Sequence, residues 1–357
     1  MTDPSLGPDD SLSAGELAAA VGAVRRDWRP VDAEPMPGGS DYVYAVTVRN
    51  GDGAERRVVL KCFRSAEALA GRTPERFLAE VDLLGLAGRE TDLPVPEVFG
   101  VSDAHEGGPA PAFLMELMPG DPPMGLAVGD DEVADRLLAE SGRYLARVHD
   151  LRSFDRFGDL VADAGRSAGD PTDLAEPVVT DGRAAWADRL RDIVDAALDG
   201  LDDRFADLET PLREYVDDRL DALDLTAEST LLHGDYRPGN LLADPGTGEV
   251  TAVLDWGAAQ AGDPRYELAW VVREFTERAP VGSPTRERVR RALFEAYETE
   301  RGIRFDRDTA FERRQRFYLA VSWIAELGHF DVWWGGAEAS ARDERAAQLR
   351  ENVQALL

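Results

Sequence analysis

The stretch that decides the fold is LLHGDYRPGNLL, Leu231–Leu242, in which two short apolar runs flank a polar loop. The loop holds four side chains that can do chemistry: His233, Asp235, Arg237 and Asn240. Fifteen residues after Asn240, the apolar run AVLD ends at Asp255. Short apolar runs between turn residues are typical of buried strands. We therefore expect two strands around the loop and a third strand that ends at Asp255.

The two aspartates and the asparagine of this region suit catalysis with a divalent cation. A carboxylate can act as a base, and an amide oxygen and a second carboxylate are ligands that Mg²⁺ accepts. The alternative is that Asp235 and Asp255 only cap turns. The spacing H-x-D-x-x-x-x-N arises by chance, but the same spacing followed by an apolar strand ending in Asp-x-Gly is much rarer. The combined pattern therefore favours a catalytic or metal-binding role for these residues over a role as turn caps.

The only lysine of the chain, Lys61, stands in the strand-like run VVLKCF, and every other basic side chain apart from histidine is arginine. The helix expected next places Glu80 on the apolar side that Phe77 and Leu84 define. A carboxylate there is costly unless a cation meets it. We expect Lys61 and Glu80 to pair; the alternative is that Lys61 reaches solvent and Glu80 pairs with an arginine.

Net charge is the strongest signal of the composition, since 69 acidic residues stand against 40 basic residues and the formal charge is −29. Self-repulsion of this size destabilises a compact chain at ordinary ionic strength. At about 1 M salt the Debye length falls to about 3 Å, which screens the repulsion. We expect a chain adapted to a salty cytoplasm, although a GC-rich genome produces some of the same bias. The acidic surface argues against nucleic acid or an anionic membrane as a partner.

The single cysteine, Cys62, excludes an internal disulfide and fits a reducing compartment. The start of the sequence lacks a basic region followed by an apolar run. No segment approaches the about 18 consecutive apolar residues of a membrane helix. We expect a cytoplasmic protein that spans no membrane, and the sequence leaves its oligomeric state open.

The chain divides into three parts by pattern. Residues 1–14 are acidic and rich in turn residues, which predicts a poorly ordered start. Residues 15–117 alternate between strand patterns and one main helix, which we expect to begin at a Thr73 cap and to close at Gly88. Residues 118–357 are mostly helical in pattern, with a long loop at 158–181.

These motifs carry a resemblance to the aminoglycoside phosphotransferase and choline kinase family, which is related to the protein kinases. The matching stretches are HGDYRPGN, VLDWG and AGDPRYELAW, with VVLK and FLMELMPG upstream in the same order. The resemblance covers roughly residues 36 to 275. It implies an α+β, bilobal, protein-kinase-like fold. Residues 15–117 would be the nucleotide-binding lobe, and residues 118–357 would be the catalytic and acceptor-binding lobe.

The resemblance also implies roles for single residues. Lys61 would contact the α- and β-phosphates of ATP and would be held by Glu80. Asp235 would orient, and could deprotonate, the hydroxyl group of the acceptor. Asn240 and Asp255 would bind Mg²⁺. In phosphoryl transfer the protein contributes mainly positioning and neutralisation of charge, which is what these groups would supply.

Three further assignments follow from the resemblance. Arg237 stands where many protein kinases carry a lysine that reaches the γ-phosphate, although here it could only brace the loop. A turn over the phosphates would be formed by Gly38, Gly39 and Ser40. This turn lacks the G-x-G-x-x-G pattern, so a plain tight turn is the alternative. The hinge that hydrogen-bonds adenine would be formed by Glu116, Leu117 and Met118.

Other residues near the motifs receive structural interpretations. His233 is expected to pack and hydrogen-bond under the loop. Asp263 is expected to brace the loop after Asp255. The Asp-Leu-Ala that is usual in the family appears here as Glu267-Leu268-Ala269, which keeps the carboxylate and changes only its reach.

The acceptor is the least determined part of the interpretation. Acceptors of the family are small hydroxylated molecules, many of them cationic, and the catalytic motifs do not encode which one is used. Aromatic and acidic side chains near the C-terminal end offer a candidate pocket: Trp323, Glu326, His329, Asp331, Trp333 and Trp334. The alternative is that these tryptophans pack the helical core. The preference for ATP or GTP stays open.

Two competing classes remain. A catalytically silent nucleotide-binding protein, acting as a sensor or scaffold, is disfavoured because none of Lys61, Asp235, Asn240 and Asp255 is lost. A protein kinase is disfavoured because residues 262–275 run directly into a helical pattern and leave little room for an activation loop.

Overall fold

The computed structural model describes residues 11–36, 40–64, 73–103, 110–129, 131–163, 175–276, 279 and 282–356. Its contacts divide the chain into two compact units. Unit 1 comprises Met1–Pro119, Leu160–Val178 and Leu254–Gly257. Unit 2 comprises Gly120–Asp159, Val179–Val253 and Ala258–Leu357. The predicted domain limits at 117 and 118 remain a prediction.

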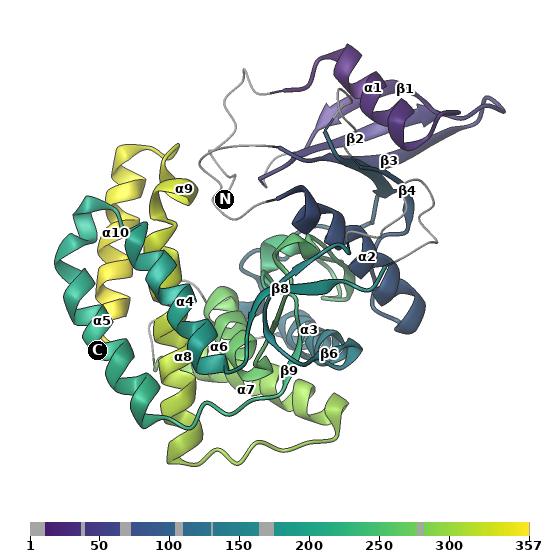
Figure 1. Cartoon of the computed structure of the whole chain (residues 1–357). Coiled ribbons are helices and arrows are strands. Elements are labelled where there is room, and N and C mark those ends of the chain that lie inside the picture. Colours follow the sequence, from purple (N-terminus) through teal and green to yellow (C-terminus); the bar gives the residue numbers. More distant parts are fainter. Residues whose placement is uncertain are drawn as a thin grey trace. The chain divides into compact units, whose positions relative to one another are not determined.

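Unit 1 is built on an antiparallel sheet of five strands in the order β1-β2-β3-β5-β4 (Figure 1). The strands are β1 Arg29–Pro35, β2 Tyr42–Arg49, β3 Glu55–Cys62, β4 Val98–Ser102 and β5 Ala112–Glu116. The strand patterns predicted in residues 15–117 include the run VVLKCF of β3, but none of them covers β1. Five of the seven residues of β1 are exposed, so this edge strand lacks the apolar alternation that marks the others.

The two faces of this sheet carry different side chains. On one face Val46, Leu60 and Leu114 pack with Val21 of helix α1 (Ala14–Val24) in one apolar cluster. Successive residues of a strand point to opposite faces, so Lys61 lies on the other face. There the ring of Phe113, its cross-strand neighbour, packs against helix α2 (Pro74–Glu90). The single lysine therefore faces α2 from a central strand.

The ends of the first two helices follow local side-chain chemistry. Thr73 caps α2 as predicted, because its hydroxyl accepts the backbone N–H of Arg76. The predicted end at Gly88 is wrong, since α2 continues to Glu90 and the Thr91 hydroxyl bonds the Ala87 carbonyl. The predicted poorly ordered start falls mainly on residues 1–10, outside the described residues. By residues 13 and 14 the chain has already entered α1.

Unit 2 is mainly helical (Figure 1). Its helices are α3 Glu132–Leu151, α4 Trp186–Asp199, α5 Glu209–Ala222, α6 Pro264–Phe275, α7 Pro284–Arg301, α8 Thr309–Gly328, α9 Phe330–Trp334 and α10 Ala339–Gln354. Helix α8 packs against α4, α6 and α10. Its side chains Phe317, Val321 and Ile324 are fully buried in the apolar cluster at the centre of this unit.

Short strands hold the loops of unit 2. They are β6 Ser153–Phe154, β7 Phe157–Val161, β8 Val178–Arg183, β9 Ser229–Leu232, β10 Leu241–Ala243, β11 Val250–Val253 and β12 Gln260–Gly262. One sheet has the order β6-β9-β12-β7-β8, and β10 pairs with β11 in a hairpin. The predicted loop at 158–181 is therefore wrong at both ends, where β7 and β8 pair into this sheet. None of the helices in the described ranges combines the length and apolar composition that crossing a bilayer requires.

Candidate active site

Lys61 is at the centre of a buried charge cluster in unit 1. Its Nζ lies 2.7 Å from Glu80 Oε2, 2.8 Å from Asp255 Oδ1 and 3.7 Å from Asp41 Oδ2. Lys61 is only 5% exposed and Glu80 only 1%. The predicted pairing of Lys61 with Glu80 is thus confirmed, and Asp255 joins the same ammonium group although it is 194 residues away in sequence.

The electrostatics of the cluster follow from its burial. Burial lowers the pKa of Lys61, but the carboxylates of Asp255, Glu80 and Asp41 outweigh it and raise the pKa well above its ordinary value. Burial raises the pKa of Glu80 to about 7, against the opposing effect of Lys61. With one ammonium among three carboxylates, the cluster favours a cation.

Asp41 is a member of this cluster that sequence reasoning missed. It is 2% exposed, and it precedes Val43, the residue of β2 that pairs with Lys61 across the sheet, by two positions. Residues two apart on a strand share a face, so Asp41 lies diagonally across from Lys61. The two-residue spacing between Asp41 and Val43 is visible in the sequence. It places Asp41 near Lys61 only when the register of β2 and β3 is known.

The polar loop of the HGD motif lies in unit 2, between β9 and β10. Strand β9 is fully buried, which fixes the start of the loop. Gly234 adopts φ 80°, and a Cβ at this position would lie 2.0 Å from the Ala258 carbonyl oxygen. Only glycine allows this close backbone approach. The loop geometry therefore depends on the Gly of His-Gly-Asp.

Asp235 is held by two neighbours from its own loop. Asn240 Nδ2 donates to Asp235 Oδ2 at 2.6 Å and to the Asp235 carbonyl at 3.0 Å. Arg237 Nε lies 3.1 Å from each carboxylate oxygen. These contacts fix the carboxylate while its side chain stays 25% exposed. Asp235 is thus oriented and accessible, as a base must be.

A buried network under the loop holds its backbone. Glu267, in the first turn of α6, accepts the backbone N–H of His233 at 3.0 Å and of Gly234 at 2.5 Å. Its Oε2 also lies 2.8 Å from His149 Nε2, and Tyr297 Oη lies 2.9 Å from His149 Nδ1. A carboxylate accepts only, so His149 Nε2 donates to Glu267 and its Nδ1 accepts from Tyr297. Sequence reasoning did not identify His149, which lies on α3.

The structural interpretation of His233 is confirmed, and Asp263 also has a structural role, as the cap of α6. His233 is fully buried, its ring packs edge-on against Tyr236, and its Nδ1 accepts the Asp235 backbone N–H at 3.3 Å. Asp263 is fully buried and caps α6, where it accepts the Arg265 backbone N–H and the Tyr318 hydroxyl. Both residues brace backbone rather than face an open site.

We expect Glu267→Ala to lower the free energy of unfolding by about 3–5 kcal/mol, because two backbone N–H groups and His149 lose a buried charged acceptor. Turnover should fall with it, since the Asp235 loop loses its support. Glu267→Asp keeps the charge, so its free energy of unfolding and its turnover should fall clearly less. Chemical denaturation of the two variants beside wild type measures this. Equal stability of Glu267→Ala and wild type would show that the network does not hold the loop.

The remaining predicted site residues fall in unit 1. Gly38 and Gly39 lie outside the described residues, and Ser40 precedes the buried Asp41 at the start of β2. Glu116 ends β5, where its backbone N–H bonds the Glu97 carbonyl at 2.8 Å. Leu117 and Met118 follow as half-buried residues without regular structure.

The tryptophan and acid cluster near the C-terminal end is divided between core and surface. Trp323 is 1% exposed, and Glu326 is 3% exposed and bound by Arg273 and Arg345. Asp331 pairs with Arg342. His329, Asp331 and Trp333 are exposed, and the ring of His329 stacks on that of Trp333. The pocket interpretation is therefore wrong for Trp323, because its indole is buried in the helical core.

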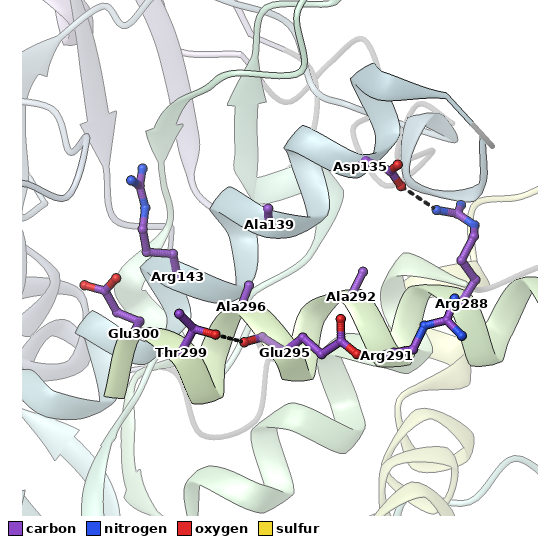
Figure 2. A pocket seen from close by; sticks show the side chains of 10 residues that line it. All are labelled: Asp135, Ala139, Arg143, Arg288, Arg291, Ala292, Glu295, Ala296, Thr299 and Glu300. Atoms are coloured by element: carbon purple, nitrogen blue, oxygen red, sulfur yellow. Dashed lines mark hydrogen bonds and ion pairs between the residues drawn. The ribbon is translucent and has the colours of Figure 1, made fainter. Parts of the chain in front are cut away.

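A groove of about 650 Å³ between α3 and α7 carries no part of the motifs. Its charges are balanced, with three basic and three acidic side chains: Arg143, Arg288, Arg291, Asp135, Glu295 and Glu300. Figure 2 shows Asp135 paired with Arg288 across the groove. We do not assign the candidate site to this groove.

Asn240 and Asp255 are the predicted Mg²⁺ ligands. Asn240 uses Nδ2 for both hydrogen bonds that its side chain makes to described residues, so its amide oxygen is directed away from Asp235. The Asp255 side chain is 36% exposed. In the described part of the chain no group of three or more His, Cys, Asp or Glu side chains is arranged to hold a metal by itself. Each residue taken by itself offers an oxygen donor of the kind that Mg²⁺ accepts.

A family model and one curated protein match the sequence of this chain. Residues 32–310 match the model of the phosphotransferase enzyme family. Over 225 residues the chain is 27% identical to mouse acyl-CoA dehydrogenase family member 10; this covers 61% of the chain but only 18% of the length of that protein.

Solved structures agree in fold. An aminoglycoside phosphotransferase in complex with GDP and kanamycin superposes with a TM-score of 0.62 at 16% identity, covering 94% of this chain and 97% of that one. Amicoumacin kinase in complex with AMP-PNP, Ca²⁺ and Ami superposes with a TM-score of 0.61 at 13% identity, covering 93% of this chain and 90% of that one. The predicted α+β, bilobal, protein-kinase-like fold class is confirmed.

Proposed function

The chain belongs to the phosphotransferase enzyme family and is a kinase-type phosphotransferase, and from this premise we propose that it moves the γ-phosphate of Mg-ATP to a hydroxyl group of a small molecule. The observation that carries the proposal is the buried Lys61 ammonium between Glu80 and Asp255, 2.7 and 2.8 Å away. A lone lysine held in this way is a preorganised cation for phosphate oxygens.

In the proposed reaction Asp235 acts on the acceptor. Its carboxylate, oriented by Asn240 and Arg237, accepts the hydroxyl proton while the acceptor oxygen forms a bond to the γ-phosphorus. The bond from the γ-phosphorus to the bridging oxygen breaks, and ADP leaves with that electron pair. Lys61 binds the α- and β-phosphates of ATP, and Arg237 neutralises charge on the transferring group.

The other binding residues are proposed from family membership and their place in the chain. Asn240 and Asp255 would hold Mg²⁺, which when bound neutralises charge on the phosphates. Backbone at Gly38, Gly39 and Ser40 would cover the phosphates, and the backbone of Glu116, Leu117 and Met118 would bind the adenine. Because solved relatives hold GDP or AMP-PNP, GTP belongs in the assays beside ATP.

The competing proposal is a silent nucleotide-binding protein. It is disfavoured because Asp235 is both oriented and 25% exposed, which a scaffold does not need. The two are separated by following ADP release with Mg-ATP and a panel of amino alcohols, sugars, amino sugars and aminoglycosides in molar potassium chloride. Release that depends on one acceptor class supports the kinase. Nucleotide binding with no acceptor-dependent release across the panel favours the silent protein.

We also propose that the fold requires salt, since the formal charge is −29. Cys62 on β3 reports this directly, because it is the only cysteine and is 4% exposed. Burial raises the pKa of the Cys62 thiol to about 12, and Asp41 adds to the increase. At about pH 8 the native thiol should therefore react far more slowly than a free cysteine, whose ordinary pKa is about 8.5.

Alkylation of Cys62 by iodoacetamide should be slow in molar potassium chloride and fast after dilution into low salt, where the chain unfolds. The rate in urea at high salt gives the fully unfolded reference. Slow alkylation that persists at low salt would contradict the requirement for salt. Fast alkylation in molar salt would contradict the burial of the thiol.

A further inference from the structure

Arg286 is a buried cation without a partner in the described part of the chain. It is 5% exposed, and its guanidinium makes no ion pair or hydrogen bond to any described residue. It stands in the first turn of α7, where the helix dipole disfavours positive charge. Burial, together with the nearby charge of Arg273, lowers the pKa of Arg286 to about 10. Glu287, the next residue of α7, opposes this decrease only in part, because its side chain is 57% exposed and lies 3.7 Å from Arg290.

The neighbouring arginines show what a satisfied cation looks like here. Arg273 binds Glu326 Oε2 at 2.9 Å, the Ser322 carbonyl at 2.9 Å and the adjacent Glu274. Arg345 binds the other oxygen of Glu326 at 3.0 Å. Burial lowers the pKa of Arg273, but Glu274 and Glu326 outweigh it and raise the value. The carboxylates of Glu274 and Glu326 therefore pair with Arg273 and Arg345. Neither forms an ion pair with Arg286.

Hydrogen-bond donors are also in excess around Arg273. Its Nε and the indole Nε1 of Trp323 are buried without an acceptor among the described residues. The Trp323 ring lies 4.8 Å from the Arg273 guanidinium carbon. Arg273 also lies 5.6 Å from the ring of Trp270, and Trp270 and Glu274 are half-buried. Buried donors and a surplus positive charge together call for an anion with several acceptor oxygens.

Helix α6 connects this cluster to the catalytic loop. Helix α6 carries Glu267, which binds the backbone of His233 and Gly234 beside Asp235, and six residues later it carries Arg273. Six residues advance a helix by about 9 Å. A small molecule of ordinary size can span that distance.

We propose that Arg286, together with Arg273 Nε, binds a carboxylate or phosphate group of the acceptor molecule. The acceptor is then a hydroxylated anion rather than a polycation. This inference rests on the proposed function for the identity of the ligand, but the anion site itself is testable without turnover.

The first test measures anion binding in the absence of nucleotide. The probes are lactate, ribose 5-phosphate and inorganic phosphate, each compared with lactamide or ribose at equal ionic strength and equal chloride. Anions should raise the melting temperature of wild type by about 2 °C or more at concentrations well above their dissociation constants. The shift should vanish in Arg286→Gln and persist in Arg291→Gln, which removes an exposed arginine of the same helix. Equal shifts in wild type and Arg286→Gln, or none in wild type, would overturn the site.

The second test separates a ligand site from a structural role. Arg286→Met removes a buried charge that has no partner among the described residues, and it should keep or raise the melting temperature. Arg273→Met leaves Glu326 with one partner and should lower it by at least about 5 °C. If both variants lose the same stability, Arg286 is structural and the inference fails.

Turnover then distinguishes this inference from the proposed function. With ATP, wild type should favour the anionic member of each acceptor pair, and Arg286→Gln should lower that preference in kcat/KM by about 10- to 100-fold. Transfer to uncharged or cationic acceptors with no effect of Arg286→Gln on preference supports the kinase and overturns the anion site. Anion binding that depends on Arg286, without transfer to any probe, supports the site and counts against the proposed function.

Discussion

Lys61→Met should lower the free energy of unfolding by about 3–5 kcal/mol and remove productive use of ATP. The substitution leaves Glu80, Asp41 and Asp255 around a side chain without charge, and the first two are 1% and 2% exposed. Uncompensated buried carboxylates carry the full cost of their lost hydration. Urea denaturation in molar salt measures the stability loss, and nucleotide titration measures the loss of binding.

The matched control is Arg57→Gln, on the same strand, because Arg57 pairs with Glu34 in a bridge whose side chains are 56% and 66% exposed. Exposed salt bridges contribute little to stability, so the free energy of unfolding of this variant should fall by less than about 1 kcal/mol. Removing both charges in Lys61→Met with Glu80→Leu should recover part of the stability but none of the ATP use. A Lys61→Met protein as stable as the control would refute the buried cluster.

Lys61→Arg tests why a single lysine remains in a chain whose other cations are arginine. A forked guanidinium cannot take the place of a point charge that contacts Glu80 at 2.7 Å and Asp255 at 2.8 Å in a pocket that leaves Lys61 5% exposed. We expect kcat/KM for ATP to fall by at least about 100-fold. Activity near the wild-type level would remove the chemical explanation of the lone lysine.

Asp235→Asn should lower kcat by about 10²- to 10⁴-fold while nucleotide binding stays close to wild type. The amide is nearly isosteric and can still face Asn240 and Arg237, but it cannot take the hydroxyl proton. Asp244→Asn, an exposed turn position two residues beyond Leu242, is the control for a change of one charge. Undiminished turnover of Asp235→Asn would show that another group is the base.

The sequence was sufficient wherever a local rule determined the structure. The pairing of Lys61 with Glu80 followed from two faces, one on a strand and one on a helix, that had to bury opposite charges. The cap at Thr73 followed from hydroxyl chemistry alone. The HGD loop between two short strands followed from apolar runs on either side of it.

The sequence was insufficient wherever long-range packing decided the outcome. Glu267 was noticed only as a departure from a pattern, because its bonds to His233 and His149 join segments 34 and 118 residues apart. Trp323 was proposed as a pocket residue. Aromatic residues beside acids give the same sequence pattern whether they form a core or a pocket. The surplus charge of Arg286 is visible only when the carboxylates of α6 and α8 have been assigned to other arginines.

The measurement that tests the account most directly is transfer of labelled γ-phosphate from ATP to an acceptor, with wild type and Asp235→Asn run in parallel in molar potassium chloride with Mg²⁺. The account predicts that wild type places the label on a hydroxyl group of one acceptor class. It also predicts that the variant binds ATP but transfers almost none. Label transfer that is equal in the two proteins, or ATP binding by wild type with no transfer to any acceptor class, would contradict it.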